Sequence, residues 1–176
     1  MIGTLLWTVA LLVVFIVAAT AAWAGWRAAP YVPTRQHDVE RMLRIADLKP
    51  GEKVVDLGAG DGRFILTAAR DYHALAVGYE ISLLPYMVAK IRLWRARLGG
   101  SATIVMKDFF YENLSDADVV VCFLTPAAMK KLGEKFRREL RSGTRIVSFA
   151  FSIAGWQPVS KDKPNPRTMA VWLYRV

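Results

Sequence analysis

The segment from Val54 to Phe64, V-V-D-L-G-A-G-D-G-R-F, has the residue types and spacing best suited to chemistry in this chain. It consists of a short apolar run, a glycine-rich turn and the start of a helical stretch, which is the context of a nucleotide-type cofactor loop. Glycines let the backbone approach a ligand closely. Free N–H groups at a helix start favour an anionic group. The segment therefore predicts a cofactor loop.

The charges of the loop limit which cofactor it can hold. A dinucleotide loop, G-x-G-x-x-G, needs glycine where Arg63 stands, and the P-loop pattern G-x-x-x-x-G-K-[ST] is absent. Asp56 precedes the three glycines and would repel a pyrophosphate. It suits a ligand with an ammonium and a sulfonium, and S-adenosylmethionine carries both. We expect this cofactor, bound by Asp56, Gly58, Gly60 and Gly62.

Two further acidic residues end the next two apolar runs. Glu80 follows the loop by about 20 residues, the usual separation for a carboxylate that accepts from ribose hydroxyls. Asp108 is placed to accept from the adenine amino group, with Phe109 beside the ring. Open α/β sheets bind ligands at the carboxyl edge of their strands. All three acids are therefore expected at one edge of one sheet.

The elements that must position these residues alternate along the chain. Short apolar runs predict strands, and the stretches between them predict helices, so we expect a Rossmann-like α/β domain with a mostly parallel sheet covered on both faces. A final apolar run at 168–174 has no helix before it, which predicts a C-terminal antiparallel hairpin after a loop or weak strand at 158–167. The expected strands are 53–57, 74–79, 103–106, 119–124 and 145–151, and the expected helices are 36–48, 64–70, 83–98 and 127–140.

Residues 1–26 contain no charged side chain, and the net charge of +9 belongs to the rest of the chain. About 20 apolar residues cross a ~30 Å hydrocarbon core. Trp7 lies toward one end, and Trp23 and Trp26 lie at the other, as interfacial aromatics do. A cleaved signal peptide has a basic n-region and a shorter core, and a buried core helix of this length is too much for so small a domain to cover. We expect a transmembrane anchor at 1–26, a linker at 27–34 and the cofactor-binding domain at 35–176.

The distribution of basic residues predicts the orientation of this anchor. Arg27, Arg35, Arg41 and Arg44 follow the apolar segment, so the positive-inside rule places the domain on the cytoplasmic side. We expect a prokaryotic inner membrane rather than an organellar one. Basic helices at 90–97 and 130–141 suit contact with anionic lipid or plain solvation. An acidic protein partner stays open, and nucleic acid is not expected as a partner.

The remaining candidate residues give little indication of chemistry. Cys122 lies in an apolar run and has no second cysteine to pair with. No Cys/His cluster has metal-ligand spacing, so no metal is expected. His37 and His73 are interpreted as a helix-entry residue and a loop residue. No catalytic residue is assigned.

The cofactor loop, Glu80 and Asp108 resemble motif I, the ribose site and the adenine site of class I methyltransferases. A narrower resemblance rests on four short segments: 31–34, 118–126, 146–158 and 171–174. These resemble the small membrane-anchored lysine methyltransferases whose mitochondrial members modify the adenine nucleotide translocase and the ATP synthase c subunit, together with their prokaryotic relatives. The resemblance covers most of residues 27–176.

The resemblance implies a methyltransferase that acts on a lysine of a membrane protein near the bilayer. Tyr31 and Trp156 are candidates for the walls of a desolvating aromatic channel, and Thr125 and Pro126 for positioning the substrate. The alternatives for Tyr31 and Trp156 are a place at the membrane interface and simple packing. Two other functions stay open: methylation of a lipid or membrane-soluble small molecule, and a non-catalytic module that binds S-adenosylmethionine.

Overall fold

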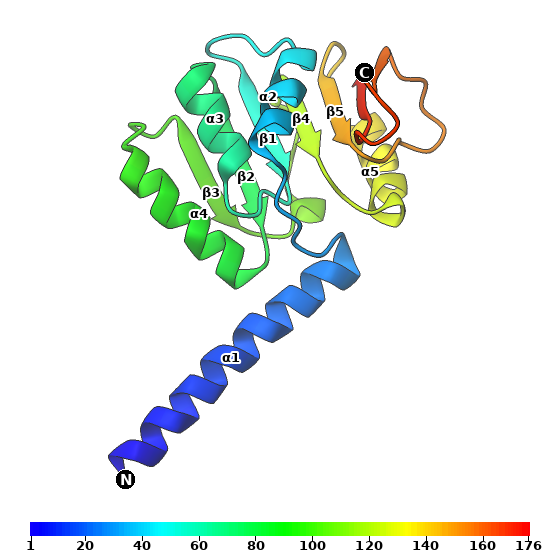
Figure 1. The fold of residues 1–176 in the computed structure, drawn as a ribbon. Helices are drawn as coiled ribbons and strands as arrows, with labels where there is room; N and C mark the ends of the chain where they lie inside the picture. Colours follow the sequence, from blue (N-terminus) through cyan, green and yellow to red (C-terminus); the bar gives the residue numbers. More distant parts are fainter.

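The computed structural model describes residues 1–176 as a long N-terminal helix joined to an α/β domain (Figure 1). The domain is built on one seven-stranded sheet of order β3-β2-β1-β4-β5-β7-β6. The strands are β1 Lys53–Leu57, β2 Leu75–Glu80, β3 Ala102–Met106, β4 Val119–Cys122, β5 Arg145–Phe149, β6 Ser160–Asp162 and β7 Val171–Arg175. The helices are α1 Ile2–Arg27, α2 Gln36–Ile45, α3 Arg63–Asp71, α4 Leu83–Ala96 and α5 Pro126–Glu139, with a 3₁₀ turn η1 at Phe109–Tyr111.

The first five strands are parallel, and β1, β4 and β5 at the middle of the sheet are buried on both faces. Successive side chains of a strand point to opposite faces, so Val54 and Val55, or Val121 and Cys122, enter different cores. One core lies between the sheet and the helices α2, α3 and α4. The other lies between the sheet and α5, together with the segment after β3. This double covering explains why the strands are continuous apolar runs instead of alternating ones.

The C-terminal hairpin is present, as the sequence predicts. β7 pairs antiparallel with β5 on one side and with β6 on the other. β6 confirms the weak-strand alternative for the segment expected to be a loop or weak strand. Two strands end earlier than expected: β4 stops at Cys122 because the chain turns toward the N-cap of α5 at Thr125, and β5 stops at Phe149 because Ala150 has a φ of +68°.

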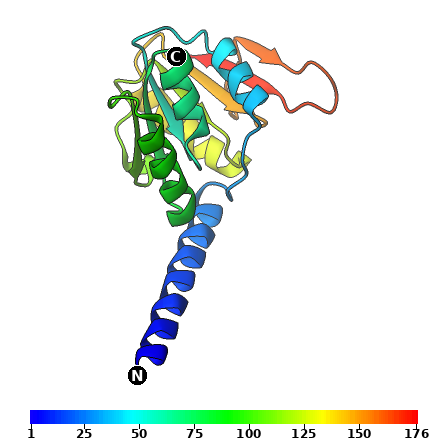
Figure 2. The ribbon, with the colours of Figure 1, turned by 60° about the vertical axis from the view of Figure 1, so that its left-hand side comes forward.

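Helix α1 projects from the domain and contacts it only toward its C-terminal end (Figures 1 and 2). Its mean hydropathy over the most apolar window is 2.6, and none of that window is buried in the protein. By length and composition the helix can cross a membrane. The alternative of a buried core helix is wrong, since the side chains of α1 up to Trp23 lie outside the domain's core.

Gly62 tests how tightly the domain is packed near its cofactor loop. Gly62 and Gly143 both have a left-handed backbone, with φ of +76° and +88°. A Cβ on Gly62 would lie 2.9 Å from the Cβ of Ala89 in α4, whereas a Cβ on Gly143 would meet nothing within 4 Å. We expect Gly62→Ala to lower the free energy of unfolding by about 1–3 kcal/mol more than Gly143→Ala, because only the first adds overpacking to backbone strain.

Thermal unfolding of the full chain in detergent, followed by circular dichroism, measures this difference. The melting temperature should fall by roughly 2–4 °C for each kcal/mol. Equal melting temperatures for the two variants would show that α4 moves away from the loop at no cost.

Candidate active site

The glycine-rich loop after β1 forms the floor of a pocket at the carboxyl edge of the sheet. Gly58 and Gly60 have φ of +82° and +54°, a backbone conformation that residues with a Cβ rarely adopt. The N–H groups of Gly58 and Ala59 donate to the carbonyl of Tyr79 at 3.0 and 2.9 Å, which attaches the loop to the end of β2. Gly62 lies at the N-cap of α3. The free N–H groups of the first turn of α3 therefore follow directly from the loop.

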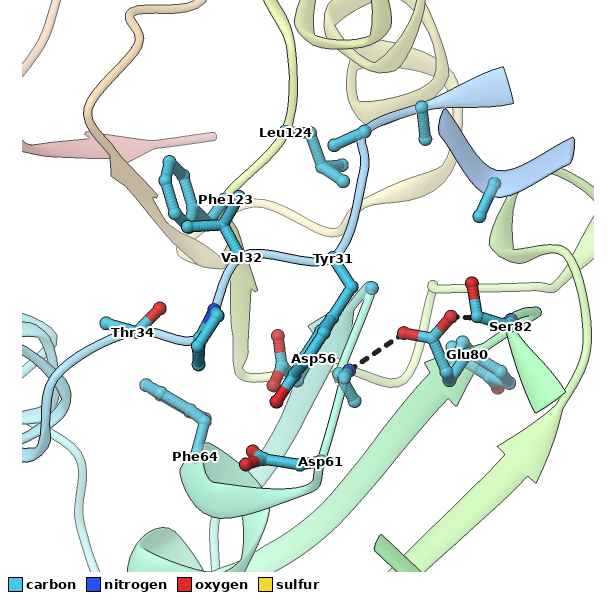
Figure 3. Close-up of a pocket in the computed structure, with 18 of the residues that line it drawn as sticks. Tyr31, Val32, Thr34, Asp56, Asp61, Phe64, Glu80, Ser82, Phe123 and Leu124 are labelled. Atoms are coloured by element: carbon cyan, nitrogen blue, oxygen red, sulfur yellow. Dashed lines mark hydrogen bonds between the residues drawn. The ribbon is translucent and has the colours of Figure 1, made fainter. Parts of the chain in front are cut away.

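Glu80, the last residue of β2, holds the loop from the other side (Figure 3). Its Oε2 accepts a hydrogen bond from the N–H of Gly60 at 2.8 Å. Its Oε1 accepts from the N–H groups of Ile81 and Ser82 at 2.9 and 2.7 Å. A carboxylate has about four acceptor positions, so Glu80 retains capacity for a donor from a ligand. The side chain lines the pocket and is largely buried.

Asp56 also lines the pocket, and its carboxyl accepts no hydrogen bond from the protein (Figure 3). Burial, followed by the negative charges of Glu80 and Asp61, raises the pKa of Asp56 to about 8. An unpaired buried acid is costly for the fold. A ligand with a positive charge at this position would stabilise the ionised form. The carboxyl group of Asp56 thus fits the ammonium of S-adenosylmethionine.

A third acid, Asp61, is neutralised within the protein. Its Oδ2 lies 2.5 Å from a guanidinium nitrogen of Arg63 and 2.6 Å from one of Arg92 in α4. Burial opposes ionisation, but these two arginines hold the pKa of Asp61 below its ordinary value. Arg63 also donates to the carbonyl of Thr34 at 2.5 Å. The residue that excludes a dinucleotide loop therefore ties the loop to the linker.

The linker between α1 and α2 forms a wall of the pocket. The carbonyl of Ala28 accepts from the N–H and the hydroxyl of Thr125, at 3.2 and 2.6 Å. The ring of Tyr31 packs directly on Gly60, where a Cβ would lie 2.7 Å from Tyr31 Cε2. Figure 3 shows this side chain descending into the pocket toward Asp61. Burial, and then the charge of Asp61, raises the pKa of Tyr31.

The pocket brings together several of the residues that the sequence singles out. From the expected set it includes Tyr31, Asp56, Gly58, Gly60, Glu80 and Phe109. Gly62 stands just outside it and supports the start of α3. Several apolar side chains also line the pocket without being predicted from the sequence, among them Phe64, Phe123 and Leu124. Only the position of Phe123 and Leu124 after a buried strand could have pointed to them.

Besides Gly62, four other predicted residues do not line this pocket. Asp108 accepts from Arg27 Nε at 2.7 Å and from the N–H of Phe110 at 2.9 Å. Thr125 caps α5, and Pro126 is its first residue. Trp156 packs edge-on against Tyr174, beneath the guanidinium of Arg137. The packing alternative for Trp156 is thus the arrangement in the structure, and its role as a channel wall gains nothing from the pocket geometry.

Two solved structures with this fold contain S-adenosyl-L-homocysteine. The crystal structure of an RNA methyltransferase from Salinibacter ruber, in complex with S-adenosyl-L-homocysteine, is 31% identical with a TM-score of 0.79, covering 82% of this chain and 94% of that one. An S-adenosylmethionine-dependent methyltransferase from Geobacter sulfurreducens, in complex with the same product, is 26% identical with a TM-score of 0.56, covering 77% and 51% of the two chains. The fold and the site thus define an S-adenosylmethionine-dependent methyltransferase.

Sequence comparison gives the particular family. The profile described as ANTKMT methyltransferase domain matches residues 56–160, and the chain belongs to this family. A protein-lysine N-methyltransferase from Saccharolobus islandicus is 41% identical over 82% of this chain and 92% of its own length. The adenine nucleotide translocase lysine N-methyltransferase of Mus musculus is 38% identical over 84% of this chain and 63% of its own length. The chain therefore spans somewhat less than two thirds of this mouse relative.

The raised pKa of Asp56 predicts opposite effects of one substitution on stability and on binding. The folded-state value of about 8 lies above the ordinary 3.8, so the folded protein favours the protonated acid. The stabilising contribution of that form is complete below about pH 4 and is lost as the pH rises through about 8. Without cofactor, Asp56→Asn should therefore unfold at a higher temperature than the wild type at pH 8, and the difference should shrink toward pH 5.

Cofactor binding should show the reverse order. An ionised Asp56 is needed to accept from an ammonium, so wild-type affinity for S-adenosylhomocysteine should rise between pH 6 and 8. Asp56→Asn loses a hydrogen bond to a charged group, worth about 2–3 kcal/mol, and should bind roughly 30- to 150-fold more weakly at pH 8. Isothermal titration calorimetry measures both. A wild-type affinity that does not change between pH 6 and 8 would contradict this role for Asp56.

Proposed function

We propose that this chain is a protein-lysine N-methyltransferase that α1 anchors in a membrane, and that its substrate is a lysine of a membrane protein close to the bilayer. The names of the Saccharolobus islandicus and mouse relatives support lysine as the acceptor. The apolar helix supports the anchor. A cleaved signal sequence near an N-terminus has the same composition, and the contacts of α1 with the domain favour a retained helix over a cleaved one.

The observation that carries this proposal is the place of the pocket relative to α1. Ala24 in the last turns of α1 and Ala28 just beyond it both line the pocket, followed by Pro30 and Tyr31 of the linker. Membrane anchor and cofactor pocket are therefore adjacent, without an intervening flexible segment. An acceptor that reaches this pocket must approach near the point where α1 leaves the bilayer, which favours membrane proteins as substrates.

Different residues of the pocket suit different groups of the cofactor. Asp56 suits the ammonium and Glu80 the ribose hydroxyls, while Gly58 and Gly60 let the ligand lie against the backbone. Gly62 positions α3, whose first N–H groups suit the carboxylate. Phe109 suits the adenine ring. The role predicted for Asp108, accepting from the adenine amino group, requires sharing its carboxylate with Arg27.

Lysine methylation places a specific demand on the protein. The bound cofactor supplies an activated methyl group, and the enzyme must present a neutral amine to it at a near-attack distance. Neutralising an amine of pKa ~10.4 near pH 7 costs about 4–5 kcal/mol. Burial lowers a lysine pKa. The pocket offers such surroundings, since Tyr31, Phe64 and Phe123 line it.

Substitutions of Tyr31 test whether this residue forms a wall of the channel that holds the acceptor lysine. Tyr31→Phe keeps the aromatic wall and should keep most of kcat/KM. Tyr31→Ala opens the wall to water, so kcat/KM should fall about 10-fold or more. The pH profile of kcat should also shift to higher pH, because a hydrated lysine in the bound complex keeps its ordinary pKa. Steady-state kinetics from pH 6 to 10 measures both quantities. An unshifted profile for Tyr31→Ala would remove Tyr31 from the acceptor channel.

Three related predictions complete the proposal. The anchor comprises residues 1–26, the linker 27–34 and the methyltransferase domain 35–176. The basic residues that follow α1 favour the cytoplasmic side for the domain. A prokaryotic inner membrane fits this arrangement and gives the enzyme access to a cytosolic metabolite.

Membranes incubated with methyl-labelled S-adenosylmethionine and the full chain test the function directly. We expect label in protein, located on lysine by mass spectrometry, and its loss with Glu80→Ala. The matched control is Glu134→Ala, since Glu134 is exposed on α5 and makes no ion pair. Label in the lipid extract would support lipid methylation, and label in RNA would support an activity like that named for the Salinibacter protein. Cofactor binding without transfer to any fraction would favour a non-catalytic module.

A further inference from the structure

Helix α4 exposes a stripe of large apolar side chains that nothing in the protein covers. Leu84, Met87, Ile91 and Trp94 are 57%, 46%, 51% and 79% exposed. Their spacing of three, four and three residues places them on one face of the helix. We call these four residues the α4 stripe. The opposite face carries the buried Pro85 and Ala89, so the stripe points directly away from the sheet.

A helix that is apolar on both faces is normally buried on both. Contiguous apolar patches on a protein surface indicate an interaction site. The stripe runs along one face of a single helix, which suits a planar partner better than an inserted peptide.

The place of α4 relative to α1 indicates what covers the stripe. The N–H of Leu83, the first residue of α4, donates to the hydroxyl of Thr20 in α1 at 3.2 Å. Both views place the first turn of α4 against the upper part of α1, and in Figure 1 α4 lies on the side of the domain toward the free end of α1. From Ile2 to Thr20 the helix rises roughly 28 Å at ~1.5 Å per residue, close to a ~30 Å hydrocarbon core. The stripe therefore starts where α1 leaves the core.

The charges around the stripe suit a phospholipid surface. Lys90 and Arg95 are exposed within α4, and the exposed Arg97 follows its last turn. No acidic residue occurs in the helix. Each basic residue near an anionic leaflet contributes about 1 kcal/mol. The indole of Trp94 at the end of the stripe is the side chain typical of membrane interfaces.

We propose that α4 is an in-plane interfacial helix, whose stripe lies in the boundary between headgroups and acyl chains of an anionic phospholipid bilayer. The inference rests on the proposed function in one respect, the insertion of α1. It adds a second attachment point to the anchor. Two attachments fix the orientation of the domain, so the pocket stays at a set height above the bilayer and reaches lysines only in a narrow zone next to the surface.

Depth-dependent fluorescence quenching of the full chain in vesicles tests this inference. The single native cysteine, Cys122, is buried, so a cysteine introduced elsewhere can be labelled selectively. An environment-sensitive probe would be placed at Met87→Cys. The matched control is Met169→Cys, since Met169 is similarly exposed, at 53%, and lies two residues before β7. The C-terminal hairpin lies on the side of the domain opposite the free end of α1 (Figure 1). Leu11→Cys reports on the insertion of α1.

The vesicles would contain phosphatidylcholine and phosphatidylglycerol, with a quencher on the lipid acyl chain near the headgroup. We expect strong lipid quenching at positions 87 and 11, and at position 169 quenching only by aqueous iodide. Lipid quenching at position 11 with iodide quenching at 87 would overturn the interfacial helix and leave the anchor intact. Protection of position 87 from both quenchers would also overturn it, because another protein or a second copy would then cover the stripe. Absence of lipid quenching at 11 would overturn the anchor and this inference together.

Discussion

The carboxylate of Glu80 connects three parts of the site. Its three hydrogen bonds reach the cofactor loop at Gly60 and the turn into α4 at Ile81 and Ser82. Hydrogen bonds to a charged group are about twice as strong as neutral ones. The end of β1, the end of β2 and the start of α4 are therefore fixed to one another through a single side chain. The pocket wall, the packing of α4 on α3 and the contact of α4 with α1 all depend on that arrangement.

The loop and sheet could be predicted because their signals are local. Asp56 and Glu80 lie at the C-terminal ends of two strands. The carboxyl ends of parallel strands meet at one edge of a sheet, whatever the order of the strands in that sheet. The glycines of the cofactor loop could be recognised from the residues next to them in the sequence. The hairpin followed from the absence of a helix before the last strand, and β7 indeed lies between β5 and β6.

The partners of the charged residues could not be predicted, since they lie far apart along the chain. Asp61 pairs with Arg92 of α4, and Asp108 pairs with Arg27 at the end of α1. Nothing in the spacing of these residues indicates contact. Trp156 follows a strand in a family-like segment, but its orientation is decided by packing on Gly133 and Tyr174. Side-chain direction at a turn depends on tertiary contacts that short motifs do not contain.

Arg27 shows how the apolar helix α1 and the site are coupled. It is the first charged residue after the apolar stretch, which makes it the natural limit of a span. Its guanidinium pairs with Asp108 and lies 4.6 Å from the ring centroid of Phe110. The adjacent carbonyl of Ala28 accepts from Thr125 after β4. A shift of α1 along its axis would strain both connections, and it would also displace the linker that places Tyr31 over Gly60. With α1 inserted as proposed, the depth of the helix in the bilayer and the shape of the pocket are therefore not independent, and the bilayer is part of the scaffold that positions the site.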